Sequence, residues 1–173
     1  IELGWPASNP KDMEAFTKIS HYKLSHAKVA AFGSTRRKGV TPAKDPNLQA
    51  ILKSKAPVAT IFGKAWIHHV EKQLKMAPSE NLKVIHESVA FLKKKKLEVF
   101  YDAEHFFDGF KDNKDYAFQC LKAAYNGGAD CLVLCDTNGG TFTWQIKKIV
   151  GEAKIYLKKN NMKIDVGVHC HND

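Results

Sequence analysis

The strongest indication of chemistry is a pair of histidines near the end of the chain, in the segment Ile164–Asp173. Apolar residues occupy the even positions of its first part, whereas His169 and His171 share the odd positions with Asp173. Side chains alternate between the two faces of a strand, so both imidazoles are predicted to point away from the helix-covered face. Two imidazoles at this spacing can chelate one metal ion. We interpret His169 and His171 as ligands of a divalent metal ion (Mg²⁺, Mn²⁺ or Zn²⁺); the alternative is that they only form hydrogen bonds.

Polar residues also follow other apolar runs that are predicted to be strands. Asp102 and Glu104 come after one such run and share a face if that strand continues. Paired carboxylates there could bind substrate, hold a metal-binding histidine or transfer a proton. The run Asp136-Thr-Asn-Gly-Gly140 follows the next strand and, taken alone, is equally typical of a turn. His69 and Arg36 lie in two further polar, glycine-containing segments, and such segments after successive strands are what the mouth of a barrel requires.

The elements that must position these residues alternate between strands and helices. Six short runs rich in Val, Ile, Phe and Cys are predicted strands: Ile1–Leu3, Lys28–Phe32, Val58–Phe62, Glu98–Tyr101, Cys131–Cys135 and Ile164–His171. Apolar residues at helical spacing predict helices from Pro10 and over Leu82–Leu92, Phe118–Tyr125 and Ile146–Leu157. The polar segment Thr35–Pro46 is predicted to be a loop with a short helix after it.

This alternation predicts an α/β fold with a mostly parallel sheet. A complete (β/α)₈ barrel uses about 31 residues per unit, so 173 residues correspond to about five and a half units. A doubly wound open sheet would be complete at this length, and the arithmetic alone does not separate the two folds. The sequence contains no G-x-G-x-x-G or G-x-x-x-x-G-K-[ST] motif, which removes the usual nucleotide-binding argument for the open sheet.

Composition excludes several other classes of protein. With 44% hydrophobic and 26% charged residues, the chain is typical of a folded globular domain. Its 27 basic and 18 acidic residues give a net charge of +9, but only Arg36 and Arg37 are arginines, so we expect solvated lysines and no nucleic-acid partner. No run is long and apolar enough for a membrane span, and no signal peptide is recognisable. The four cysteines include no C-x-x-C pair and predict reduced thiols in a cytoplasmic protein.

The residues as a set resemble a known enzyme family. His169-Cys-His-Asn-Asp173 is similar to the H-x-H-N-D strand motif of the isopropylmalate synthase, homocitrate synthase and citramalate synthase family. Four further stretches look most like the citramalate synthase branch: Glu2–Pro10, Ala31–Gly39, Tyr101–Gly109 and Leu134–Gly140. The resemblance implies that residues 1–173 form a partial catalytic TIM barrel with strands two to seven of eight. We therefore expect both chain ends to be cuts through a larger protein whose first strand, eighth strand and C-terminal regulatory domain lie outside this sequence.

The resemblance also implies an activity and roles for particular residues. The reaction would be a Claisen-type condensation of acetyl-CoA with a 2-oxo acid; in the citramalate branch this acid is pyruvate, the products are (R)-citramalate and CoA, and the pathway leads to isoleucine. His169 and His171 match metal ligands, while Glu104, Thr137 and His69 match residues that contact the 2-oxo acid or assist proton transfer. Arg36 is matched to a group that holds the substrate carboxylate, and the parent protein is expected to be a homodimer.

Three alternatives remain open at this stage. Within the family, the protein could be a 2-isopropylmalate synthase of leucine biosynthesis or a homocitrate synthase. A metal-dependent hydrolase of the amidohydrolase kind also uses H-x-H on a barrel strand, but there the pair typically lies on the first strand. The third alternative is a truncated, inactive remnant, because six of eight strands leave open sheet edges that are prone to pairing or aggregation.

Overall fold

The computed structural model describes residues 1–171 and is built on one parallel sheet. Its six strands lie side by side in chain order. They are β1 (Glu2–Gly4), β2 (Ala30–Ser34), β3 (Val58–Lys64), β4 (Glu98–Glu104), β5 (Cys131–Asp136) and β6 (Asp165–Cys170). Every neighbouring pair is parallel. A doubly wound sheet reverses its strand order part way across, so this uninterrupted order is that of a barrel segment.

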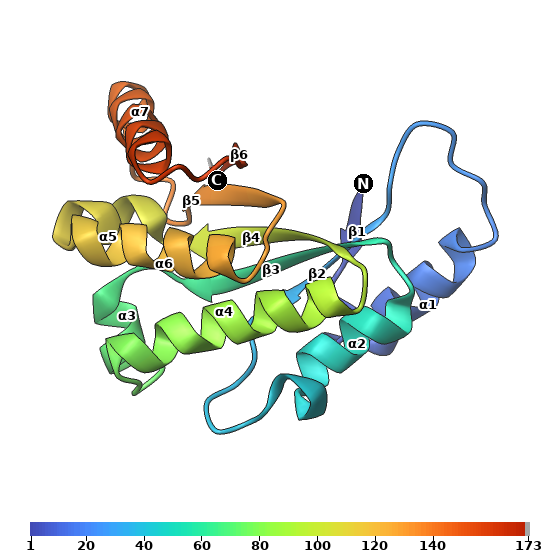
Figure 1. Ribbon diagram of the computed structural model, residues 1–173. Coiled ribbons are helices and arrows are strands. Elements are labelled where there is room, and N and C mark those ends of the chain that lie inside the picture. Colours follow the sequence, from blue (N-terminus) through green and yellow to red (C-terminus); the bar gives the residue numbers. More distant parts are fainter. Residues whose placement is uncertain (172–173) are drawn as a thin grey trace.

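Helices connect the strands, and α2, α4 and α6 lie along one face of the sheet (Figure 1). The helices are α1 (Pro10–Ile19), α2 (Pro46–Ser54), α3 (Ile67–Lys72), α4 (Pro78–Lys94), α5 (Phe106–Asp112), α6 (Lys114–Asn126) and α7 (Thr143–Lys159), with a 3₁₀ turn, η1, at Pro42–Lys44. Side-chain caps fix several of their starts. Asn9 accepts the backbone N–H of Asp12 before α1, and Asp45 accepts two backbone N–H groups at the start of α2. None of the helices in the described part of the chain is long and apolar enough to cross a membrane.

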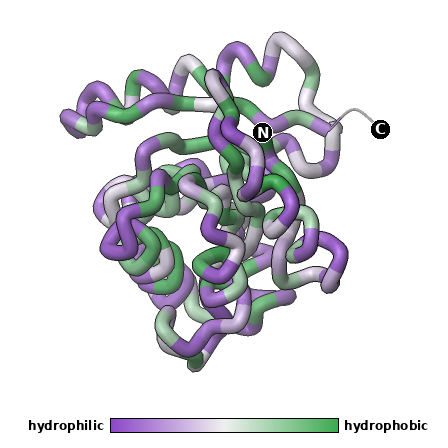
Figure 2. Tube along the Cα trace, turned by 90° about the vertical axis from the view of Figure 1, so that its right-hand side faces the viewer, coloured by the Kyte–Doolittle hydropathy of each residue, from purple (hydrophilic) through white to green (hydrophobic). Residues whose placement is uncertain are grey.

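The core fills the space between this face of the sheet and its helices. In Figure 2 the helical turns alternate between hydrophilic and hydrophobic colours, as expected when only one side of each helix packs inward. Alternate strand residues point to the helices and are fully buried, together with residues of the facing helices: Ala59, Ile61, Val99, Tyr101, Leu132, Leu134, Leu48, Ile51, Ile85, Leu92 and Leu121. The strand residues between them point to the opposite, concave face, and there the polar side chains gather.

The structure confirms all six predicted strands and the helices predicted from apolar spacing, with differences at some strand ends and two added helices. β3 and β4 continue through Lys64 and Glu104, beyond their predicted ends at Phe62 and Tyr101, so Asp102 and Glu104 do share a face. Two short helices, α3 and α5, were not predicted. Both follow strand ends and have only six and seven residues, too few to show a helical period in the sequence.

Candidate active site

A cavity of about 190 Å³, lined by both polar and aromatic side chains, lies on the concave face, toward the carboxyl ends of the strands. Five strands or the residues just after them supply its lining: Phe32, Phe62, Asp102, Glu104, Cys135, Thr137, His169 and His171. Barrel enzymes place their sites at this end of the sheet. A larger hollow of about 540 Å³ runs along α7 and β6, but its lining of lysines and apolar residues with Asn161 and Asp165 contains no histidine and no pair of carboxylates. We therefore take the concave cavity as the candidate active site.

The two histidines lie on one face, as the strand pattern predicts. The rings of His169 and His171 are stacked, with centroids 5.0 Å apart and planes 19° from parallel. The backbone N–H of His171 donates to the carbonyl of Asp136, which ties the end of β6 to the end of β5. The last two residues of the H-x-H-N-D motif, Asn172 and Asp173, fall outside the described residues.

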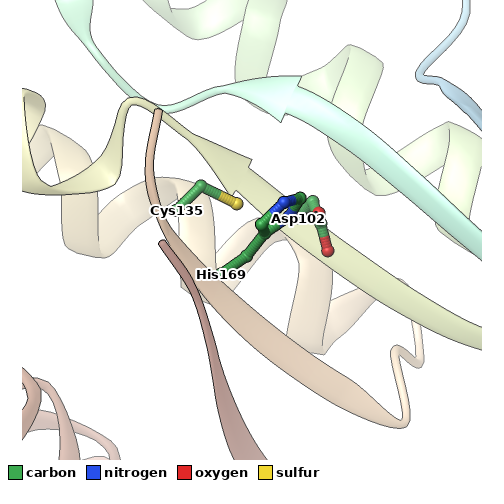
Figure 3. Close-up of side chains that lie close together, drawn as sticks. All are labelled: Asp102, Cys135 and His169. Carbon is green, nitrogen blue, oxygen red and sulfur yellow. Dashed lines mark hydrogen bonds and ion pairs between the residues drawn. The ribbon is translucent and has the colours of Figure 1, made fainter. Parts of the chain in front are cut away.

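Cys135 on the neighbouring strand β5 and Asp102 on β4, one strand further, both lie close to His169 (Figure 3). The Asp102 Oδ2 atom lies 3.0 Å from His169 Nδ1. Burial raises the pKa of Asp102, and the hydrogen bond to His169 acts in the opposite direction. Burial likewise raises the pKa of the Cys135 thiol, well above its ordinary value. One possible ligand atom from each of these three residues lies within 4.8 Å of the others, so the cluster could itself hold a metal ion.

Glu104 presents its two oxygens to different surroundings. Oε1 accepts from Lys64 Nζ at 2.8 Å, and both side chains are mostly buried. Oε2 is buried and has no hydrogen-bond partner among the described residues. A buried carboxylate oxygen without a partner carries a large desolvation cost, so a ligand or water that donates to it would be bound favourably.

The segment after β5 is both a turn and a part of the cavity. Asp136 accepts the backbone N–H and the hydroxyl of Thr141 at 3.1 and 2.8 Å, which closes the turn. Gly139 has φ of 62°, and a Cβ there would lie 2.6 Å from the carbonyl oxygen of His171. The next residue after Asp136, Thr137, lines the cavity, and its Oγ1 accepts the backbone N–H of His105 at 2.9 Å.

Aromatic rings form the apolar wall of the cavity. Phe32 on β2 and Phe62 on β3 are stacked with centroids 5.4 Å apart. Trp5 meets both rings edge-on, at 5.9 and 5.5 Å, and its Nε1 donates to Asn47. These rings were not assigned to the site from the sequence. The alternation of side chains along β2 and β3 could have predicted their place. Phe32 and Phe62 directly follow the fully buried Ala31 and Ile61, so they point to the opposite face of the sheet.

Two predicted site residues do not line the cavity. His69 lies in α3 with its ring 4.4 Å from that of His105, and burial, followed by the charges of His105 and Lys64, lowers its pKa. Arg36 is buried and binds Glu87 through Nε and Nη2 at 2.9 and 2.7 Å. Arg36 Nη1 donates to two backbone carbonyls. The structure therefore brings Glu104, Thr137, His169 and His171 together, whereas His69 and Arg36 lie outside the cavity lining.

The strand order, the helices on the outer face and the cavity on the concave face define this chain as part of an α/β-barrel protein. Solved structures show the same fold. A hydroxymethylglutaryl-CoA lyase from Pseudomonas aeruginosa matches 95% of this chain and 53% of that chain, with a TM-score of 0.71 and 12% identity. The HMG-CoA lyase from Brucella melitensis matches 97% of this chain and 57% of that chain, with a TM-score of 0.70 and 11% identity. The predicted partial barrel is confirmed, and at these low identities the likeness concerns the fold alone.

Sequence comparison gives the family. A family model described as HMGL-like matches residues 1–173, and the chain belongs to that family. An (R)-citramalate synthase of Geobacter sulfurreducens is 51% identical over 173 residues, and one of Sulfolobus acidocaldarius is 47% identical. A 2-isopropylmalate synthase of Halothermothrix orenii is 27% identical over the same length. Each alignment covers all of this chain but only 32% of the relative, so the chain spans about a third of their length.

Proposed function

We propose that the protein containing this chain condenses acetyl-CoA with pyruvate and water to give (R)-citramalate and CoA. The observation that supports the proposal is a difference in sequence identity to two groups of relatives, the (R)-citramalate synthases and the 2-isopropylmalate synthases. Identity to the (R)-citramalate synthases is 40–51%, whereas identity to the 2-isopropylmalate synthases is 27–29%. The cavity supports it, because it joins imidazoles and carboxylates to an aromatic wall.

The donor set of the cavity fits a divalent metal ion. His169 and His171 would hold the ion, since their rings share the concave face. Imidazole nitrogens and carboxylate oxygens together suit Zn²⁺, Mn²⁺ or Mg²⁺. When bound, the ion would supply Lewis-acid polarisation of the 2-oxo acid carbonyl.

The chain's own groups would bind and orient the reactants. The unpartnered Oε2 of Glu104 would accept a proton or a hydrogen bond from a reacting group. Thr137 already accepts the N–H of His105, so its own hydroxyl hydrogen would be available to a substrate oxygen. His69 and Arg36 would support these groups from outside the cavity, His69 next to His105 and Arg36 by fixing the strand-to-helix segment through Glu87.

The aromatic wall would limit the size of the 2-oxo acid. The stacked rings of Phe32 and Phe62 are backed by Trp5, so neither can turn away easily to admit a branched side chain. Pyruvate carries only a methyl group and needs little apolar space. We therefore assign pyruvate, rather than 2-oxoisovalerate or 2-oxoglutarate, as the preferred substrate.

The test compares kcat/KM for CoA release from acetyl-CoA by the full-length protein with the three 2-oxo acids. We expect pyruvate to be preferred by at least about tenfold, the scale on which hydrophobic pockets discriminate between side chains of different size. Preference for 2-oxoisovalerate would instead identify a 2-isopropylmalate synthase. We also propose a homodimer for the full-length protein, which light scattering would test.

A further inference from the structure

The Asp102 carboxylate contacts one particular ring nitrogen of His169. Asp102 Oδ2 lies 3.0 Å from His169 Nδ1, and the Asp102 side chain is only 5% exposed. The two residues lie 67 positions apart in the sequence, on β4 and β6, which are both neighbours of β5 in the sheet. The aspartate is thus held by the sheet and approaches one particular nitrogen of the imidazole.

This contact bears on which nitrogen of His169 carries the proton. When Asp102 is ionised, its carboxylate only accepts hydrogen bonds, and Nδ1 is then the donor. In a neutral imidazole the other nitrogen, Nε2, then keeps its lone pair and can bind a metal ion. Without the carboxylate, nothing in the contact would select this tautomer or the orientation of the ring.

We propose that Asp102 is a positioning residue that fixes the tautomer and ring orientation of His169, so that Nε2 faces the metal ion. The inference rests on the proposed function, because it needs His169 to be a ligand. Carboxylate–histidine pairs of this kind typically change metal affinity 10- to 100-fold when the carboxylate is removed. Asp102 would thus act through His169 and not by touching the ion.

The alternative is that Asp102, Cys135 and His169 bind the ion themselves. Their ligand atoms lie within 4.8 Å of one another. One observation favours a positioning role, because Asp102 Oδ2 is already engaged by His169 Nδ1.

The experiment measures Mn²⁺ affinity and thermal stability of the full-length protein and its variants. We expect Asp102→Asn to weaken Mn²⁺ binding 10- to 100-fold, because the amide can donate to Nδ1 and favour the wrong tautomer. Pulsed EPR of bound Mn²⁺ should then show one coupled imidazole nitrogen fewer than the wild type. Cys135→Ser should keep wild-type affinity and both couplings.

Asp45→Ala is the matched control for loss of a buried carboxylate. Asp45 is fully buried but caps α2 away from the cavity, so its loss should lower Tm and leave Mn²⁺ affinity unchanged. Wild-type affinity and couplings in Asp102→Asn would overturn the positioning role. Loss of affinity in Cys135→Ser would also overturn it, in favour of the three-residue site. Wild-type affinity in His171→Ala would overturn the proposed metal site itself and this inference with it.

Discussion

Glu104 is placed so that one oxygen is neutralised and the other is left for a reactant. Lys64 binds Oε1 at 2.8 Å, while the buried Oε2 has no hydrogen-bond partner among the described residues. A pair of this kind is sensitive to loss of one member, because the remaining charge is then left poorly solvated. The pair therefore links the stability of this end of the sheet to the chemistry of the site.

Lys64→Met should lower stability by on the order of 1 to 3 kcal/mol, since it leaves the Glu104 carboxylate unpaired. The double variant Lys64→Met/Glu104→Gln should be less destabilised than Lys64→Met alone, because no unpaired charge remains. Thermal unfolding of the three proteins provides the measurement. Equal Tm values for Lys64→Met and the wild type would show that the ion pair contributes nothing.

The lowered pKa of His69 leads us to expect that the stability of the folded protein depends on pH. Its pKa is lowered from the ordinary value of 6.5, chiefly by burial. The folded state therefore binds fewer protons at this site than the unfolded state, and stability must rise with pH in that range. The contribution is fully present above pH 6.5 and is lost as the pH falls through the lowered pKa of the folded state.

We expect Tm to decrease less between pH 7.5 and pH 5 in His69→Gln than in the wild type. Exposed His26 provides the control, since His26→Gln should keep the wild-type pH dependence. The same Tm change in His69→Gln and the wild type would contradict the assignment.

At the scale of elements, the backbones of α5 and of the segment after β3 approach each other closely at Gly109. A Cβ on Gly109 would lie 2.3 Å from the carbonyl oxygen of Ala65, and a backbone atom cannot turn away as a side chain can. At Gly151, in α7, no atom beyond the adjacent residues and the nearby backbone of the helix lies within 4 Å of the corresponding position. The two helical glycines thus differ only in their surroundings.

Gly109→Ala should destabilise the protein by about 1 to 3 kcal/mol through overpacking. Gly151→Ala should stabilise it by about 0.5 to 1 kcal/mol, because alanine restricts the unfolded chain and suits a helix. Thermal unfolding measures both. Equal effects of the two substitutions would show that the close approach at Gly109 relaxes without cost.

The strands could be predicted because each is a short apolar run, and the helices between them show apolar residues at helical spacing. Alternation of polar and apolar residues in the last strand placed His169 and His171 on one face. The short helices α3 and α5 lacked that periodicity. α5 also begins just after His105, whose φ of 56° is unusual outside glycine. The Asp102–His169 contact joins residues 67 positions apart, and only the strand order of the folded sheet brings them together.

At the scale of the molecule, the described chain is a half-barrel whose outermost strands, β1 and β6, have one neighbour each. Val168 on β6 is 46% exposed, so its outward face is less covered than those of the central strands. Open edges and uncovered apolar residues favour association between chains. The strands therefore enclose the cavity on one side only.

Residues 1–173 alone should therefore show no synthase activity and should self-associate. A site walled on one side leaves reactants poorly oriented, and a displacement of about 1 Å can cost on the order of a hundredfold in rate. A thiol-release assay with pyruvate, acetyl-CoA and Mg²⁺, Mn²⁺ or Zn²⁺ tests this. Release above that of the same chain carrying His169→Ala and His171→Ala would show that the half-barrel is sufficient.

The most direct measurement is pyruvate-dependent CoA release, together with bound divalent metal, for the full-length protein and its His169→Ala/His171→Ala variant. Both rings face the proposed site, so we expect the double variant to lose activity and bound metal while keeping its fold by circular dichroism. His21→Ala/His26→Ala removes two exposed histidines outside the cavity and should retain both properties. Wild-type CoA release and metal content in the His169→Ala/His171→Ala protein would contradict the account.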